Sequence, residues 1–187
     1  MKIADLVTLD DKAEFRSDVQ LDAYDRPDQN LALLRSYLFS SAIPARSPSL
    51  TRDISAVGLL KELVDVYLNE RTINRLCLIA NYGHGKSHLA LALANYFGRA
   101  VGSPELAVLY PKITAAIDDP AGATRYREFK QNRGEFLLIR LRGDVPQSLH
   151  AQFLLGLSRG LAEHEATRGI KPPFWYEEAA RLLQFQQ

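Results

Sequence analysis

The sequence predicts an α/β fold, in which parallel strands form the middle layer of a three-layer sandwich and a helical N-terminal segment precedes them. Two short apolar runs, 76–79 and 136–141, have the composition of strands that are buried on both faces of a parallel sheet. A glycine-containing loop and an apolar helical pattern over 87–97 follow the first run. A loop and a second helical pattern, which opens at Pro146, follow the second run.

Two amphipathic helices are expected before the first of these strands. Asp28 is the expected cap of one helix, and Leu31 and Leu34 lie on its apolar face. Asp53 or Ser55 is expected to start the other, which ends around residues 69–71. The segment further toward the N-terminus contains a partial alternation, 15–21, that suits a short edge strand.

Three more helices are expected after the glycine loop. Ser103 and Pro104 have the pattern of an N-cap followed by a first-turn proline. Residues 118–122 predict a turn, and a polar helix follows over 123–131. The last long helix, 146–164, is expected to bury one apolar face, formed by Leu149, Phe153, Leu154, Leu157 and Leu161.

The most informative stretch is 80–87, Ala-Asn-Tyr-Gly-His-Gly-Lys-Ser, because it joins the first expected strand to a helix as a phosphate-binding loop (P-loop) does. Its glycines let successive backbone N–H groups turn around a phosphate. Lys86 is expected to bind the β- and γ-phosphates of a nucleoside triphosphate, and Ser87 to ligate Mg²⁺. Ala80 is the one departure from the usual G-x-x-x-x-G-K-[ST] string. The predicted nucleotide-binding residues are Asn81, Tyr82, Gly83, His84, Gly85, Lys86, Ser87 and His88.

One other interpretation of this stretch stays open: it is a glycine turn between a core strand and a core helix, and Lys86 is merely solvated. A metal site at His84 and His88 is not predicted, because no Cys or carboxylate lies at ligand spacing nearby. We expect them on the loop and on the helix surface, with His88 touching the nucleotide.

Composition and charge exclude several classes of protein. The 187 residues are 47% hydrophobic and 24% charged, which is an ordinary globular composition. A net charge of +1 creates no overall field that attracts nucleic acid or an anionic membrane. Cys77, the single cysteine, cannot form an internal disulfide and fits a reducing compartment. No signal peptide and no run of the ~20 apolar residues needed to cross a bilayer is present, so we expect a cytoplasmic protein without a membrane partner.

Parts of a complete nucleotide-hydrolysing domain are not found in the sequence. A domain of this kind usually has a sheet of about five or six strands, more than the runs above supply. No convincing run of four apolar residues ends on Asp or Glu. The nearest match is 136–141, after which Asp144 is displaced into the loop. We therefore expect the N-terminal part of a longer ATPase, with a helical segment at 1–70 and the first part of a P-loop ATPase domain at 71–187. No catalytic residue is assigned, and hydrolysis is expected to need residues beyond Gln187 or a partner.

The run 81–91 resembles the phosphate loop of the AAA+ initiator and helicase-loader ATPases, in which Gly-Lys-Ser/Thr-His-Leu is common. The chain also resembles the large P-loop ATPases of bacterial anti-phage systems, the BREX-type PglY-like proteins, in which a helical segment precedes a Gly-x-Gly-Lys-Ser-His loop. This resemblance, whose specific part covers 76–97, implies that Lys86 binds the phosphates of ATP and Ser87 binds Mg²⁺. It also implies ATP-driven work on DNA or in a defence complex with other protein subunits.

Two other function classes remain as alternatives. A small-molecule kinase also uses a phosphate loop, but such kinases generally begin with the strand before the loop, whereas here helices come first. A nucleotide-binding interaction module without hydrolysis is favoured by the aromatic run 174–176, because exposed aromatic side chains anchor interfaces. The competing interpretation is that Trp175 packs the last helix onto the core.

The remaining basic residues carry weaker hypotheses. Arg140 or Arg142, at the end of the second expected strand, is a candidate contact to the nucleotide, and surface salt bridging is the competing interpretation. A direct DNA-binding role is not predicted, because acidic residues interrupt the modest cluster of Arg125, Arg127, Lys130 and Arg133.

Overall fold

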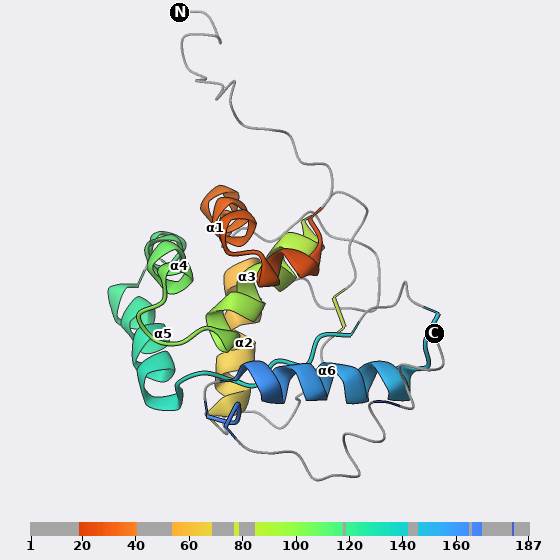
Figure 1. The fold of residues 1–187 in the computed structure, drawn as a ribbon. Coiled ribbons are helices and arrows are strands. Elements are labelled where there is room, and N and C mark those ends of the chain that lie inside the picture. Colours follow the sequence, from red (N-terminus) through yellow and green to blue (C-terminus); the bar gives the residue numbers. More distant parts are fainter. Residues whose placement is uncertain are drawn as a thin grey trace, which may run out of the picture.

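The computed structural model describes residues 19–40, 54–68, 77–78, 85–117, 119–141, 146–164, 166–169 and 181. Every regular element within these ranges is a helix, as Figure 1 shows. The elements are the 3-10 helix η2 (Leu21–Asp25) and the α-helices α1 (Pro27–Ser36), α2 (Ala56–Tyr67), α3 (Lys86–Gly98), α4 (Pro104–Ala115), α5 (Pro120–Arg133) and α6 (Leu149–Glu163).

The predicted α/β fold, a partial P-loop NTPase three-layer sandwich with parallel strands, is wrong: the described part of the chain is helical and contains no strand. Of the first expected strand, 76–79, the structure describes Cys77 and Leu78, and both are exposed. A strand buried on both faces of a sheet would cover both side chains. Cys77 therefore does not lie in a buried strand as the sequence predicted.

The second expected strand, 136–141, has no regular secondary structure and pairs with no strand among the described residues. It instead passes between α3 and α6. At one end, the Phe136 N–H donates to the Phe97 carbonyl oxygen at the end of α3, over 3.0 Å. Further along, a Cβ atom added to Gly160 of α6 would lie 3.1 Å from the Leu138 carbonyl oxygen. An apolar run shows that a segment is covered, but it does not show whether strands or helices cover it.

The edge strand expected at 15–21 is also not found in the described residues. Residues 15–18 lie outside the described ranges, and Leu21 is the first residue of η2. This short helix carries the buried Ala23 and Tyr24. With Leu33 and Leu91 they form a small apolar cluster of their own, so η2 packs against the middle of α3.

The main core lies among the α-helices and contains residues from both sides of the predicted domain boundary at residue 70. Leu60 and Val64 of α2 belong to the same buried cluster as Tyr96 of α3. The division into segments 1–70 and 71–187 stays a prediction, but α3 is enclosed by helices from both. The members of this core are Leu34, Tyr37, Phe39, Leu60, Val64, Ala92, Tyr96, Phe97, Leu106, Leu109, Ile113, Tyr126 and Phe129.

Side-chain caps explain where several helices begin. The Ser55 hydroxyl accepts a hydrogen bond from the Gly58 N–H over 3.0 Å, and the Ser103 hydroxyl accepts from the Leu106 N–H over 3.3 Å. Each cap satisfies an N–H that has no partner within the helix. The predicted start at Ser103 is confirmed, and Ser55 is the cap of the two alternatives that the sequence left open.

Three other boundaries differ from those that we expected. Helix α1 begins at Pro27, with Arg26 before it, so Asp28 lies inside the first turn. The turn expected at 118–122 is shorter, because the Asp119 carboxylate caps α5 and the helix already begins at Pro120. Helix α6 begins after its cap, Ser148.

Helix α6 does not bury the apolar face that its sequence predicts. Leu149, Phe153 and Leu154 are 69%, 45% and 41% exposed. The residue that α6 buries is Gly160, at its contact with the segment after α5. The described residues contain no sheet that could cover that face.

Within the described ranges, none of the helices is both long enough and apolar enough to cross a lipid bilayer.

Candidate nucleotide site at the start of α3

The candidate site lies where the glycine loop meets α3. Gly85 immediately precedes the helix and has φ 72° and ψ 19°, in the left-handed region. A side chain in this conformation costs roughly 1–2 kcal/mol, which glycine avoids. Gly85 is exposed, and a Cβ atom added to it would have no neighbour within 4 Å. Backbone conformation, and not crowding, therefore explains glycine at this position.

Helix α3 directs its first turn toward this loop. Lys86 is its first residue and is half-buried, and Ser87 beside it is exposed. The N–H groups of a first helical turn have no partner inside the helix, and together with the helix dipole they favour an anion. The other predicted site residues, which lie outside the described residues, are Asn81, Tyr82, Gly83 and His84.

His88, also in the first turn of α3, contacts α1. Its Nε2 atom lies 2.6 Å from the Leu33 carbonyl oxygen, and its ring centroid lies 4.8 Å from that of Tyr37. Since a carbonyl oxygen only accepts, Nε2 carries the hydrogen and donates it. No local pattern predicts this contact, because the two partners are 55 positions apart.

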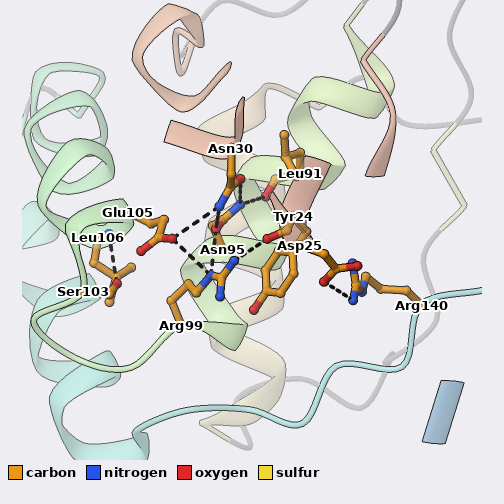
Figure 2. A network of polar contacts seen from close by, with 10 residues as sticks. All are labelled: Tyr24, Asp25, Asn30, Leu91, Asn95, Arg99, Ser103, Glu105, Leu106 and Arg140. Atoms are coloured by element: carbon orange, nitrogen blue, oxygen red, sulfur yellow. Dashed lines mark hydrogen bonds and ion pairs between the residues drawn. The ribbon is translucent and has the colours of Figure 1, made fainter. Parts of the chain in front are cut away.

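Farther along α3, a network of buried polar side chains joins α3 to α1 and α4 (Figure 2). Asn30 of α1 and Asn95 of α3 are fully buried and each donates to the other, over 2.8 and 2.9 Å. The Asn95 amide also donates to the Leu91 carbonyl oxygen over 2.8 Å. Glu105 of α4 accepts from the Asn30 amide over 3.5 Å. The buried amides therefore have partners, as groups removed from water require.

Arg99 extends this network toward η2. Its Nε atom lies 3.3 Å from Asn95 Oδ1 and 3.5 Å from Glu105 Oε1. Its guanidinium carbon lies 3.9 Å from the centre of the Tyr24 ring, and Nη2 donates to the Tyr24 carbonyl oxygen. Burial raises the pKa of Tyr24, so this phenol stays neutral and its ring serves as a surface for cations.

Arg140 lies near the other end of the network and has partners within the fold. It forms a two-pronged contact with Asp25, over 3.0 and 2.7 Å, and its guanidinium carbon lies 4.6 Å from the Tyr24 ring centre. Of the two arginines that were candidate nucleotide contacts, Arg142 lies outside the described residues. Arg140 connects the segment after α5 to η2 through its ion pair with Asp25. This contact agrees with the interpretation that the arginine forms a salt bridge within the fold.

The basic residues of α5 also contact groups of the protein itself. The four basic residues of this helix were considered as a surface for DNA, but DNA binding was not predicted from the sequence. Burial lowers the pKa of one of them, Lys130, to about 8. The contacts are Asp65 for Arg125, the Tyr110 ring for Arg127, the Phe97 carbonyl oxygen for Lys130 and the Tyr67 carbonyl oxygen for Arg133.

The described residues include no group of three or more His, Cys, Asp or Glu side chains that could hold a metal ion. A nucleotide-bound Mg²⁺ does not need such a group, because phosphate oxygens and water supply most of its ligands. Ser87, the residue expected to ligate Mg²⁺, is exposed in the first turn of α3.

Comparison of the chain with protein-family models, with curated proteins and with solved structures found no significant match.

Proposed function

We propose that this chain binds ATP together with Mg²⁺ at the loop that ends at Gly85. The observation that carries the proposal is the left-handed Gly85 directly before α3, with Lys86 as the first residue of the helix. This geometry occurs within the string Gly-x-Gly-Lys-Ser at 83–87. A loop that turns sharply into a helix in this way presents backbone N–H groups to a phosphate.

Each described residue of the loop would bind a different part of MgATP. Lys86 would place its ammonium group on the β- and γ-phosphates, and Ser87 would ligate Mg²⁺. Gly85 would let the backbone approach the phosphates closely. The N-terminal amides and the dipole of α3 would neutralise part of the phosphate charge.

The proposal does not depend on the sandwich that the structure excludes. Phosphate binding needs a loop and a firmly held helix, and α3 is firmly held, since Leu91, Ala92, Asn95 and Tyr96 are fully buried. Burial of these residues fixes the axis of the helix and therefore the direction in which its N-terminal amides point, whereas Ser87 in the first turn is exposed.

We further propose that nucleotide state drives a conformational change in a larger bacterial, cytoplasmic assembly. The support is the resemblance of the loop to those of initiator, helicase-loader and anti-phage ATPases. Partners would be other protein subunits, with DNA contacted indirectly. No residue of the chain is assigned to hydrolysis.

A nucleotide-binding interaction module without hydrolysis is the second candidate. It is favoured by the exposed apolar side chains of Leu149, Phe153 and Leu154 on α6. Exposed apolar groups that lie together are typical of protein interfaces. Release of phosphate from bound ATP distinguishes the candidates, because the module would bind ATP and leave it intact.

Titration with a fluorescent ATP analogue tests the proposal. Wild-type protein should bind in the presence of Mg²⁺, and Lys86→Ala should lower the affinity by about tenfold or more, since a hydrogen bond to a charged group contributes roughly 1.5–3 kcal/mol. Ser87→Ala should lower the affinity in Mg²⁺ and leave it unchanged in EDTA. Lys61→Ala, at a half-exposed lysine of α2, is the control. Equal affinities of wild type and Lys86→Ala would overturn the proposal.

Two glycines provide a matched pair for the loop itself. Gly85 and Gly102 both have positive φ, 72° and 87°, and a Cβ atom added to either would meet nothing within 4 Å. Replacement by alanine should destabilise the fold to a similar extent at both positions, about 1 kcal/mol or more. Only Gly85→Ala should weaken ATP binding. A similar loss in Gly102→Ala would show that the loss reflects stability and not the site.

A further inference from the structure

Helix α3 contacts α1 through polar side chains at two places. His88 contacts the Leu33 carbonyl oxygen, and Asn95 pairs with Asn30. Seven residues separate the two side chains on α3, which is about two helical turns and places them on the same face. The face of α3 that meets α1 thus begins in the turn that holds Lys86.

Three hydrogen-bond donors lie within bonding distance of the Leu33 carbonyl oxygen. The Tyr37 N–H lies 3.0 Å away, the Ser36 hydroxyl 2.9 Å and His88 Nε2 2.6 Å. A carbonyl oxygen has two lone pairs, so three donors compete for it. The position of His88 therefore changes how strongly the last turn of α1 holds the Tyr37 N–H.

The C-terminal end of α1 has a second anchor, which does not involve α3. Lys112 of α4 donates to the carbonyl oxygens of Arg35 and Tyr37, over 2.7 Å in each case. A lysine near the end of a helix satisfies carbonyl groups that have no intrahelical partner. The end of α1 is thus held from α4 by Lys112 and from the first turn of α3 by His88.

We infer that His88 is a positioning residue that transmits occupancy of the phosphate site to the C-terminal end of α1. The inference rests on the proposed binding of ATP. His88 follows Ser87 directly and shares its helical turn with Lys86, so phosphates that order this turn also fix the imidazole against Leu33. Helix α1 would then report whether the loop holds a nucleotide.

Thermodynamic linkage makes the coupling reciprocal. If bound MgATP strengthens the contact between His88 and α1, that contact must strengthen MgATP binding by the same factor. Loss of the donor at His88 should therefore weaken MgATP binding, although the side chain faces α1 rather than the loop. A residue that only supports the fold would change stability without this matched pair of effects.

Hydrogen exchange of the Tyr37 amide, measured by NMR with and without MgATP, tests the inference. In wild-type protein, MgATP should speed exchange by about fivefold, because a firmer bond from His88 to the Leu33 oxygen weakens the competing bond from the Tyr37 N–H. This factor corresponds to a hydrogen bond of about 1 kcal/mol. His88→Phe keeps an aromatic ring beside Tyr37 but removes the donor, so it should abolish this response and weaken MgATP binding by about the same factor. His88→Gln, which keeps an N–H donor, should retain part of both.

Two controls separate the coupling from general destabilisation. His150→Phe makes the same substitution at an exposed histidine of α6 and should leave the response unchanged. Lys112→Met should loosen the end of α1 in both states but preserve the effect of MgATP. If MgATP binds without a change at Tyr37, or if the change persists in His88→Phe, the inference is wrong. If MgATP does not bind at all, the proposed function fails and this inference fails with it.

Discussion

Asn30 and Asn95, which are 65 positions apart in the chain, form a reciprocal pair of buried amides between α1 and α3. Both side chains are fully buried, and the hydrogen bonds of the pair measure 2.8 and 2.9 Å. A buried amide costs free energy unless its groups are paired, so each asparagine makes the other tolerable. The pair also fixes the position of α1 along α3, because a shift of either helix would break both hydrogen bonds between the two amides.

Replacement of one member of this pair should destabilise the protein more than its loss of contacts suggests. Asn95→Leu leaves the Asn30 amide buried without its main partner and should lower the free energy of unfolding by about 2–3 kcal/mol. The double variant Asn30→Leu/Asn95→Leu should lose less than the sum of the two single variants. Urea denaturation measures both, with Asn132→Leu at an exposed position of α5 as the control. Strict additivity would show that the pair is not coupled.

Two helical glycines should respond to alanine in opposite directions. At Gly98, an added Cβ atom would lie 2.3 Å from Leu138 Cδ1 and 2.7 Å from the Tyr24 hydroxyl. Overpacking of this kind costs typically 1–3 kcal/mol, so Gly98→Ala should lower the melting temperature. At Gly122 the nearest atoms lie 3.4 Å away, which leaves room for a methyl group. Gly122→Ala should therefore raise the melting temperature, because the better helix propensity of alanine adds about 0.5–1 kcal/mol to the free energy of unfolding. Calorimetry on both variants tests the contrast, and a gain at Gly98 would contradict the close packing.

Stability should rise with pH because of Lys130. Its side chain is fully buried, its Nζ atom donates to the Phe97 carbonyl oxygen over 2.6 Å, and burial lowers its pKa from 10.5 to about 8. Below pH 8 both the folded and the unfolded chain carry the proton, and folding pays the full cost of burying the charge. Above pH 8 the folded state releases the proton first, so the free energy of unfolding increases up to the pKa of the unfolded state.

The measurement is chemical denaturation between pH 7.5 and about 9.5, a window below the ordinary tyrosine pKa of about 10. Burial raises the pKa of Tyr37 to about 12, so this tyrosine adds stability that is complete below pH 10 and lost above it. Lys130→Met should remove the rise between pH 8 and 9.5, by an amount on the order of 1–2 kcal/mol. Lys61→Met, at a half-exposed lysine, should keep it. A flat wild-type profile would show that Lys130 does not titrate in this range.

Helix α6 should detach when its glycine contact is filled. A Cβ atom added to Gly160 would lie 2.9 Å from Leu137 Cδ1 and 3.1 Å from the Leu138 carbonyl oxygen, so the helix must move away from the segment after α5. Gly160→Val should speed hydrogen exchange in α6 by at least tenfold while the exchange of α3 stays slow. Gly169→Val is the control, because nothing lies within 4 Å of a Cβ atom added there. Unchanged exchange in α6 would mean that the contact does not hold the helix.

Local signals in the sequence identified the helices well. Ser103 and Pro104 mark the start of α4, and Ser55 caps α2, since a side-chain cap acts within a few residues and does not depend on the rest of the fold. The glycine at residue 85 was expected to adopt a conformation closed to other residues, and it does so. The helix after the loop was expected to start at Ser87, and α3 begins one residue earlier, at Lys86.

The sheet and the burial of faces could not be predicted in the same way. The apolar runs 76–79 and 136–141 were interpreted as strands, but pairing depends on segments far apart in the chain, and the described residues supply no partner strand. The apolar face of α6 was expected to be buried, yet Leu149 is 69% exposed. Periodicity shows which side chains share a face, but it does not show what that face meets.

Local patterns were enough to predict where several helices start and which backbone position before α3 needs glycine, because hydrogen bonds and dihedral angles a few residues apart control these features. Tertiary structure alone decided that His88 contacts Leu33, that Asn30 pairs with Asn95 and that Lys130 is buried. The partners in these contacts are far apart in the chain. Lys130 and the Phe97 carbonyl oxygen that it contacts are separated by 33 positions, and the other two pairs by more. Their geometry exists only after the helices have packed, since packing brings the partners together and removes the water that would otherwise satisfy them.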